Sequence, residues 1–197
     1  MLETLSKDNV MYSLIQKYGV LTLNDNYMQT SGNLFQDLST TIIRQQLSNR
    51  VADIILQRLE NLLNKEMTPN KLLSIADEEL RSIGLSMNKV NYIKNIAHAI
   101  QNGHLKLDEL YKLNEQEIRE CLTKIKGIGS WTVDMFLIFS LHFPDIFSFG
   151  DAGLNKAIQN LYGNNNILTK QQIFEITEHW RPFRSYACLY LWRSLDN

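Results

Sequence analysis

The sequence predicts an all-α protein built from two helical lobes with a cleft between them. Apolar residues recur at the three- and four-residue spacing of amphipathic helices through most of the 197 residues. Capping residues precede many of these stretches and glycine follows several of them, as expected for helix starts and stops. Strand-like alternation is rare, and the chain shows no internal repeat or linker. These observations predict helices that are joined by short connections and packed against one another.

The amino-terminal part divides into helices with identifiable caps. Ser6 is placed to cap a first helix that Gly19 ends. The connection from Asn24 to Asn33 is polar and is expected to be a loop. An apolar stripe then runs from Leu34 to Leu47. The next helices are expected to begin at Ser48, at Thr68-Pro69, at Asp77 and at Ser86.

The second part contains a turn that organises the chain. A helix predicted from Asn114 to Leu122 leads into Lys126-Gly127-Ile128-Gly129, and an apolar helix follows. Two glycines this close allow positive φ and expose successive N–H groups. Ser130 and Thr132 stand at the start of the apolar helix, whose amides and dipole favour a phosphate. The last helices are expected over 152–162, 169–180 and 183–195.

Composition restricts the class of protein. A hydrophobic content of 44% is typical of a chain that buries a core. The two cysteines, Cys121 and Cys188, are too few for a disulfide framework, which favours a reducing, cytoplasmic setting. No run is long enough to cross a membrane, and the amino terminus lacks a signal peptide. The net charge of −1 counts against a large basic surface but allows DNA binding through backbone amides.

Asp151 is the candidate catalytic group. It lies in Gly150-Asp151-x-Gly153, directly before a predicted helix. An isolated acid at this position is usually an N-cap. A capping carboxylate held by amides also stays ionised and can stabilise positive charge, so both roles can coexist.

These motifs together resemble a known family. Gly127-x-Gly129, Trp131-Thr132 and Gly150-Asp151-x-Gly153 are similar to the helix-hairpin-helix, Gly/Pro…Asp (HhH-GPD) superfamily of DNA base-excision glycosylases. The resemblance is strongest to the alkylbase branch, the 3-methyladenine DNA glycosylase II type, in a compact form. It extends from the helix around Phe35 to the carboxyl end. It implies lobes formed by residues 1–47 with 145–197 and by residues 48–144.

The resemblance implies a mechanism. Asp151 would face the sugar of an extruded nucleotide, stabilise the positive charge that develops as the base leaves, and orient or deprotonate water. Family members with lyase activity carry a lysine where this chain has Trp131, and tryptophan cannot form a Schiff base. A monofunctional enzyme that removes alkylated purines and leaves an abasic site is therefore expected.

The resemblance also assigns the remaining site residues. The candidates for the base pocket, in which indole faces suit cationic purines, are Trp131, Trp192, Tyr186, Met135 and Tyr27. The DNA-binding candidates are Lys126, Gly127, Ile128, Gly129, Ser130 and Thr132 of the turn, and Gln45, Gln46 and Leu47, with Gln46 at the intercalating position. Arg184 and Ser185 match a structural pair of the family. Arg44 and Lys126 depart from the family, which usually has glycine and often proline there.

The resemblance implies no required cofactor. The two cysteines are too few for the iron–sulfur cluster of the endonuclease III type. A sodium or potassium ion is implied at the backbone carbonyls of Thr123, Ile125 and Ile128. The four histidines, His98, His104, His142 and His179, lack zinc-type spacing.

The expected partner is double-stranded DNA containing damaged bases, with no membrane and with the protein as a monomer. Two alternatives remain open from the sequence. One is the same scaffold acting on deaminated or mismatched bases. The other is a non-catalytic DNA-binding module that uses the hairpin only as a phosphate clamp.

Overall fold

All regular structure in the described residues is helical, which confirms the all-α prediction. The computed structural model describes residues 1–24, 31–164 and 166–196. Its helices are α1 (Leu2–Leu5), α2 (Asn9–Tyr18), α3 (Leu34–Arg44), α4 (Asn49–Leu62), α5 (Pro69–Ser74), α6 (Asp77–Ser82), α7 (Met87–Gln101), η1 (Leu107–Lys112), α8 (Glu115–Thr123), α9 (Ser130–Phe139), α10 (Ala152–Tyr162), α11 (Lys170–Glu178) and α12 (Arg184–Arg193). Ser48, Thr68, Ser86, Asn114 and Thr169 cap the helices that follow them, each accepting a backbone N–H.

The amino-terminal helix differs from the prediction. Ser6 does not begin it; α1 ends at Leu5, and a second helix, α2, begins after Asp8. The Asp8 carboxylate accepts hydrogen bonds from the N–H groups of Val10 and Met11 at 2.8 and 3.1 Å. An aspartate side chain competes with helix continuation by taking up these amides, so the chain breaks there.

The chain forms two compact units, residues 1–29 with 137–197 (unit 1) and residues 30–136 (unit 2). This division differs from the expected lobes, which separated α3 from α4 at residue 47. In the structure α3 packs against both α4 and α7 within unit 2. The apolar side of α3 is turned toward those helices, and Leu38 and Ile42 are fully buried.

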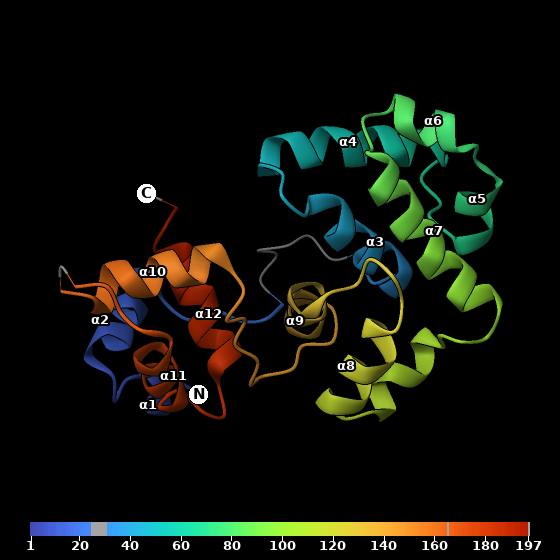
Figure 1. Ribbon diagram of the computed structural model, residues 1–197. Coiled ribbons are helices and arrows are strands. Elements are labelled where there is room, and N and C mark those ends of the chain that lie inside the picture. Colours follow the sequence, from blue (N-terminus) through green and yellow to red (C-terminus); the bar gives the residue numbers. More distant parts are fainter. Residues whose placement is uncertain (25–30, 165, 197) are drawn as a thin grey trace. The chain divides into compact units, whose positions relative to one another are not determined.

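Unit 2 is arranged around α7, against which α3, α5 and α6 pack (Figure 1). Leu72 of α5, Leu80 of α6 and Ile93 of α7 have no exposed surface. Full burial of one such side chain contributes about 1.5–3 kcal/mol. These contacts fix the position of α7, which in turn supports the glycine turn described below.

Unit 1 is arranged around α12, against which α2 and α10 pack (Figure 1). Eight of the ten residues of α12 are buried, so this helix is an interior element. The Asp8 carboxylate accepts from the hydroxyl of Tyr162 at 2.9 Å and the indole N–H of Trp180 at 3.0 Å. Burial and this carboxylate raise the pKa of Tyr162, so its hydroxyl stays a donor.

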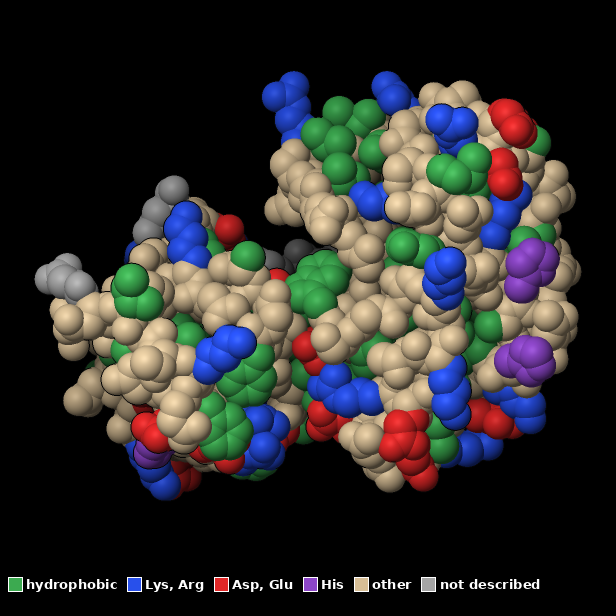
Figure 2. Space-filling view, in the orientation of Figure 1, with side chains coloured by type: hydrophobic (Ala, Val, Ile, Leu, Met, Phe, Trp, Pro, Cys, Tyr) green, Lys and Arg blue, Asp and Glu red, His purple; other side chains and the backbone are tan. Residues whose placement is uncertain are grey.

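Charge is mixed on the face drawn in Figure 2, where acidic and basic side chains are interspersed within each unit. This distribution agrees with the net charge of −1. Among the described residues, no helix is both long and apolar enough to span a bilayer.

Candidate functional site

The glycine turn of unit 2 joins α8 to α9 in a compact hairpin. The Ile125 N–H donates to the Leu122 carbonyl and the Ile128 N–H donates to the Ile125 carbonyl, both at 3.0 Å. The side chain of Asn95 on α7 donates to the Lys126 carbonyl at 3.0 Å. The first bond of α9 runs from the Val133 N–H to the Gly129 carbonyl at 3.1 Å. The backbone N–H groups that precede Val133 lie at the N-terminus of α9, where the helix dipole favours an anion.

Gly127 is required by both conformation and space. Its φ is +110°, and a Cβ built on it would lie 2.3 Å from Cγ of Tyr92 on α7. A Cβ built on Gly129, two residues later, would have no neighbouring atom within 4 Å. The ring of Tyr92 thus fills the space that an alanine at residue 127 would need, while residue 129 faces open space.

We expect Gly127→Ala to destabilise unit 2 and Gly129→Ala to be tolerated. The first change combines a strained backbone with overpacking and should lower the free energy of unfolding by about 2 kcal/mol or more. The second should cost about 1 kcal/mol or less, since alanine is only a poorer N-cap than glycine. Urea unfolding of the two variants checks this. Equal losses would show that Tyr92 does not restrict the turn.

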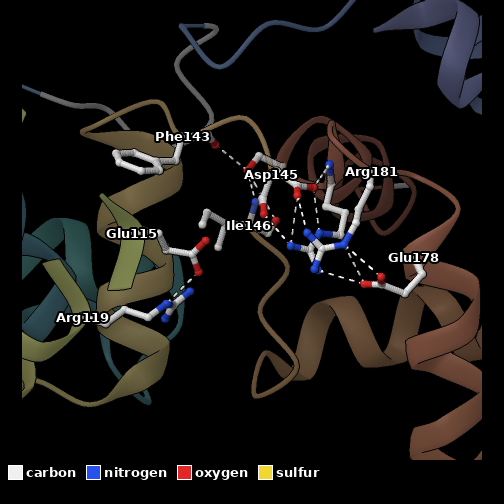
Figure 3. A network of polar contacts seen from close by, with 9 residues as sticks. Glu115, Arg119, Phe143, Asp145, Ile146, Glu178 and Arg181 are labelled. Carbon is white, nitrogen blue, oxygen red and sulfur yellow. Dashed lines mark hydrogen bonds and ion pairs between the residues drawn. The ribbon is translucent and has the colours of Figure 1, made fainter. Parts of the chain in front are cut away.

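Ion pairs of Arg119 fasten the hairpin helices. Arg119 of α8 reaches Asp134 of α9 through Nη1 at 2.7 Å and Glu115 of its own helix through Nε at 2.8 Å. Figure 3 shows the contact between Glu115 and Arg119. Burial acts to lower the pKa of Arg119, but the two carboxylates outweigh it and raise the pKa. The guanidinium therefore stays charged, and it holds α8 to α9 next to the turn.

The loop of Gln45, Gln46 and Leu47 follows α3. Gln46 is exposed and has a φ of +56°. The Gln45 side chain donates through Nε2 to Oγ1 of Thr132 at 2.8 Å. Thr132 is only 1% exposed, so its hydroxyl fastens this loop to α9 and is not presented to solvent. The structure thus brings two separately predicted DNA-contacting segments together.

Among the predicted pocket residues of unit 2, Met135 is 3% exposed and Trp131 is half-buried. Tyr27 lies outside the described residues. Arg44, where the family usually has glycine, forms an ion pair with Asp53 at 2.6 Å. This pair joins the end of α3 to α4 and accounts for the arginine.

Asp151 lies in unit 1 and caps α10. Its Oδ1 accepts the Leu154 N–H at 2.8 Å and the indole N–H of Trp192 at 3.0 Å. The side chain of Asn155 donates to the carbonyls of Phe149 and Asp151, at 2.9 and 2.8 Å. The side chain of Asp151 and the loop that carries it are therefore both held in place, and the carboxylate has a fixed position at the N-terminus of α10.

Gly153 leaves space for this contact. A Cβ at residue 153 would lie 3.1 Å from Oδ1 of Asp151 and 3.3 Å from Cδ1 of Trp192. The Gly-Asp-x-Gly spacing therefore allows the indole to reach the carboxylate. Trp192 is 7% exposed, and its ring centroid lies 5.4 Å from that of Phe139. Tyr186, another pocket candidate on α12, is half-buried, and its ring lies 6.1 Å from that of Phe183 between centroids, at an interplanar angle of 73°.

Arg184 and Ser185 support the chain before the Asp151 loop. Ser185 Oγ donates to the Phe143 carbonyl at 2.6 Å and accepts the Ile146 N–H at 2.9 Å. Arg184 binds Asp145 through Nε at 2.8 Å. Figure 3 shows Asp145 and Glu178 facing Arg181, which pairs with both. Asp145 is thus occupied by arginines and has a structural role.

The sequence pattern does not point to several supporting residues. Lys89, Tyr92 and Asn95 of α7 contact the turn or the 45–47 loop, and Asn155 fastens the Asp151 loop. Only Asn155 had a usable signal, since it lies four residues after a capping aspartate on the same helix face.

Comparison with known proteins shows the family of the chain. The model of the HhH-GPD superfamily base excision DNA repair protein matches residues 40–182. DNA-3-methyladenine glycosylase 1 of Schizosaccharomyces pombe is 33% identical over 81% of this chain and 72% of its own length. A putative DNA-3-methyladenine glycosylase of Bacillus subtilis is 30% identical over 83% of this chain, which spans 60% of that protein.

A solved structure extends the comparison to the fold. The structure of S. pombe 3-methyladenine DNA glycosylase in complex with abasic DNA has a TM-score of 0.89 and is 30% identical, covering 99% of this chain and 96% of that one. The matched region includes both the glycine turn and Asp151. The chain therefore belongs to the HhH-GPD superfamily of base excision DNA repair proteins.

Proposed function

We propose that the protein is a monofunctional DNA glycosylase that extrudes and hydrolytically removes N-alkylated purines during base excision repair. The observation that carries this proposal is the Asp151 carboxylate, fixed by the Leu154 amide and the Trp192 indole within the family motif. The names of the S. pombe and B. subtilis relatives support alkylated purines as the substrate class.

The chemistry needs one carboxylate. As the bond from the sugar to the base breaks, positive charge develops on the sugar, and a fixed carboxylate stabilises it. Asp151 also orients or deprotonates the attacking water. An N-alkylated purine is cationic and already a good leaving group, so a strong general acid is not required. The indoles of Trp131 and Trp192 suit such a cation through their ring faces.

Unit 2 supplies the contacts to DNA. Amides of the turn at Gly129 and Ser130, with the Lys126 side chain, bind phosphate, and Gln46 fills the space left by the extruded nucleotide. The partner is double-stranded DNA with a damaged base, bound by a monomer in the compartment that holds the cell's DNA. A sodium or potassium ion at the turn would be held by the backbone carbonyls of Thr123, Ile125 and Ile128, which are oxygen ligands.

A Schiff-base step is not proposed, because residue 131 is tryptophan. Borohydride reduction during turnover should therefore trap no covalent complex with DNA. The product strand should break only after alkali treatment. A trapped complex, or direct strand cleavage, would reverse the assignment as monofunctional.

Trp192→Phe is expected to slow base release while leaving the affinity for undamaged duplex DNA unchanged. Phenylalanine keeps an aromatic ring beside Phe139 but loses the N–H that orients Oδ1 of Asp151. Loss of such an orienting contact should cost about tenfold or more in rate. Single-turnover release and duplex binding by fluorescence anisotropy check this. A larger loss of affinity than of rate would assign Trp192 to binding instead.

The function is tested by incubating the protein with DNA treated with a methylating agent and separating the released bases by chromatography. We expect 3-methyladenine and 7-methylguanine in the supernatant. Release only from deaminated or mismatched DNA would favour the other specificity. DNA binding with no base release would favour a non-catalytic clamp.

A further inference from the structure

Lys89 occupies an unfavourable place in unit 2. α7 begins at Met87 after the Ser86 cap, so Lys89 lies in the first turn. A cation is disfavoured there, because the helix dipole places its positive end at the N-terminus. The side chain is half-buried, and this burial lowers the pKa of Lys89. A lysine in this position therefore needs a compensating contact.

That contact is the backbone at the end of α3. The Lys89 ammonium donates to the Ile43 carbonyl at 2.7 Å and to the Gln45 carbonyl at 2.9 Å. The last carbonyls of a helix lack intrahelical donors and carry the negative end of its dipole. The ammonium supplies the missing donors and offsets the negative end of the dipole, through charge-assisted hydrogen bonds.

Both hydrogen bonds lie on the amino-terminal side of a strained residue, Gln46. Gln46 has a φ of +56°, in the left-handed region that residues other than glycine rarely adopt. Such conformations persist where the surroundings hold them, and they concentrate at functional sites. Besides Lys89, the loop is held by the Gln45 side chain on Thr132 at 2.8 Å and by the Leu47 N–H on the Arg44 carbonyl at 3.2 Å. The exposed Gln46 is thus fixed from α7 and from α9.

We propose that Lys89 is a positioning residue that holds the 45–47 loop ready for Gln46 to enter the duplex. This inference rests on the proposed function. A loop ordered before DNA arrives avoids the entropy cost of ordering it at the moment the nucleotide leaves the stack. Lys89 therefore acts on extrusion of the nucleotide rather than on cleavage of the glycosidic bond.

The test compares two substrates, a duplex with 7-methylguanine opposite cytosine and the same duplex with an abasic site opposite the lesion. Lys89→Met keeps an unbranched apolar side chain of nearly the same length but cannot donate. Its single-turnover release should fall about tenfold on the paired lesion, the effect of losing a charge-assisted hydrogen bond. The defect should shrink to about twofold opposite the abasic site, because an unpaired base is easier to extrude. Lys89→Arg, which retains cationic donors, should recover most of the rate.

Two controls distinguish a positioning role from a general loss of charge or of stability. Lys112→Met removes an exposed charge from the same unit and should behave as wild type. The ratio of the two substrates is independent of the folded fraction, so a destabilised Lys89→Met remains informative. An equal defect on both substrates, or the same loss in Lys112→Met, would overturn the positioning role. If the wild-type protein released no base from both substrates, that result would instead contradict the proposed function.

Discussion

Asp151→Asn is expected to abolish base release almost completely while the protein stays folded. The amide oxygen of asparagine can accept the same two hydrogen bonds that Oδ1 of Asp151 accepts from Leu154 and Trp192. The negative charge is lost, however, and with it the stabilisation of the cationic sugar and the activation of water that we propose for Asp151. The single-turnover rate should fall by about 10²–10⁴-fold.

Asp151→Ala provides the matched comparison. Alanine cannot cap α10, so this variant should lose about 1 kcal/mol of unfolding free energy that Asp151→Asn retains. Both variants should be equally inactive. Measured rates and thermal unfolding curves separate the chemical role of the carboxylate from its capping role. An active Asp151→Asn variant would leave Asp151 only as a cap.

Arg184→Ala is expected to destabilise unit 1 severely. Arg184 is 7% exposed, and it donates to the Asp145 carboxylate, to the Asp145 carbonyl and to Glu178. Removing one partner of a buried pair leaves the other partly unsatisfied, which costs about 3 kcal/mol or more. The free energy of unfolding in urea measures this directly. Arg184→Lys should recover little, because lysine cannot form the bidentate contact.

Arg181→Ala is the control for burial. Arg181 contacts the same two acids, but its side chain is 48% exposed. Solvent screens such a pair, and its loss should cost about 1 kcal/mol or less. Similar losses for Arg181 and Arg184 would show that the network is stabilised by the number of ion pairs and not by burial.

The helices were predictable because their signals are local. Ser48, Ser86 and Asn114 mark helix starts, and in the structure the side chain of each accepts from the amide three residues later. Asp8 shows the limit of this reasoning. It outcompetes Ser6 because it binds two amides, and nothing in the apolar spacing distinguishes the two caps.

The site was predictable only in part. The motif points to Asp151 as the catalytic candidate, which stays a prediction. Its contact with Trp192 joins residues 41 positions apart and depends on how α10 packs on α12, so the sequence does not show it. From the sequence, Lys89 is indistinguishable from a solvent-exposed lysine, because its partners are backbone carbonyls that carry no sequence signal. The packing of Tyr92 on Gly127 is equally hidden, although the positive φ expected of the turn glycines is present at Gly127.

We propose that the Asp151 carboxylate stabilises positive charge on the sugar as the base leaves. Affinity measurements check this role with DNA that contains either a protonated pyrrolidine abasic analogue, which mimics that charge, or a neutral tetrahydrofuran analogue. The wild-type protein should bind the cationic analogue about 10²-fold more tightly or better, and Asp151→Asn should bind the two almost equally. The same preference in both proteins would contradict the claim.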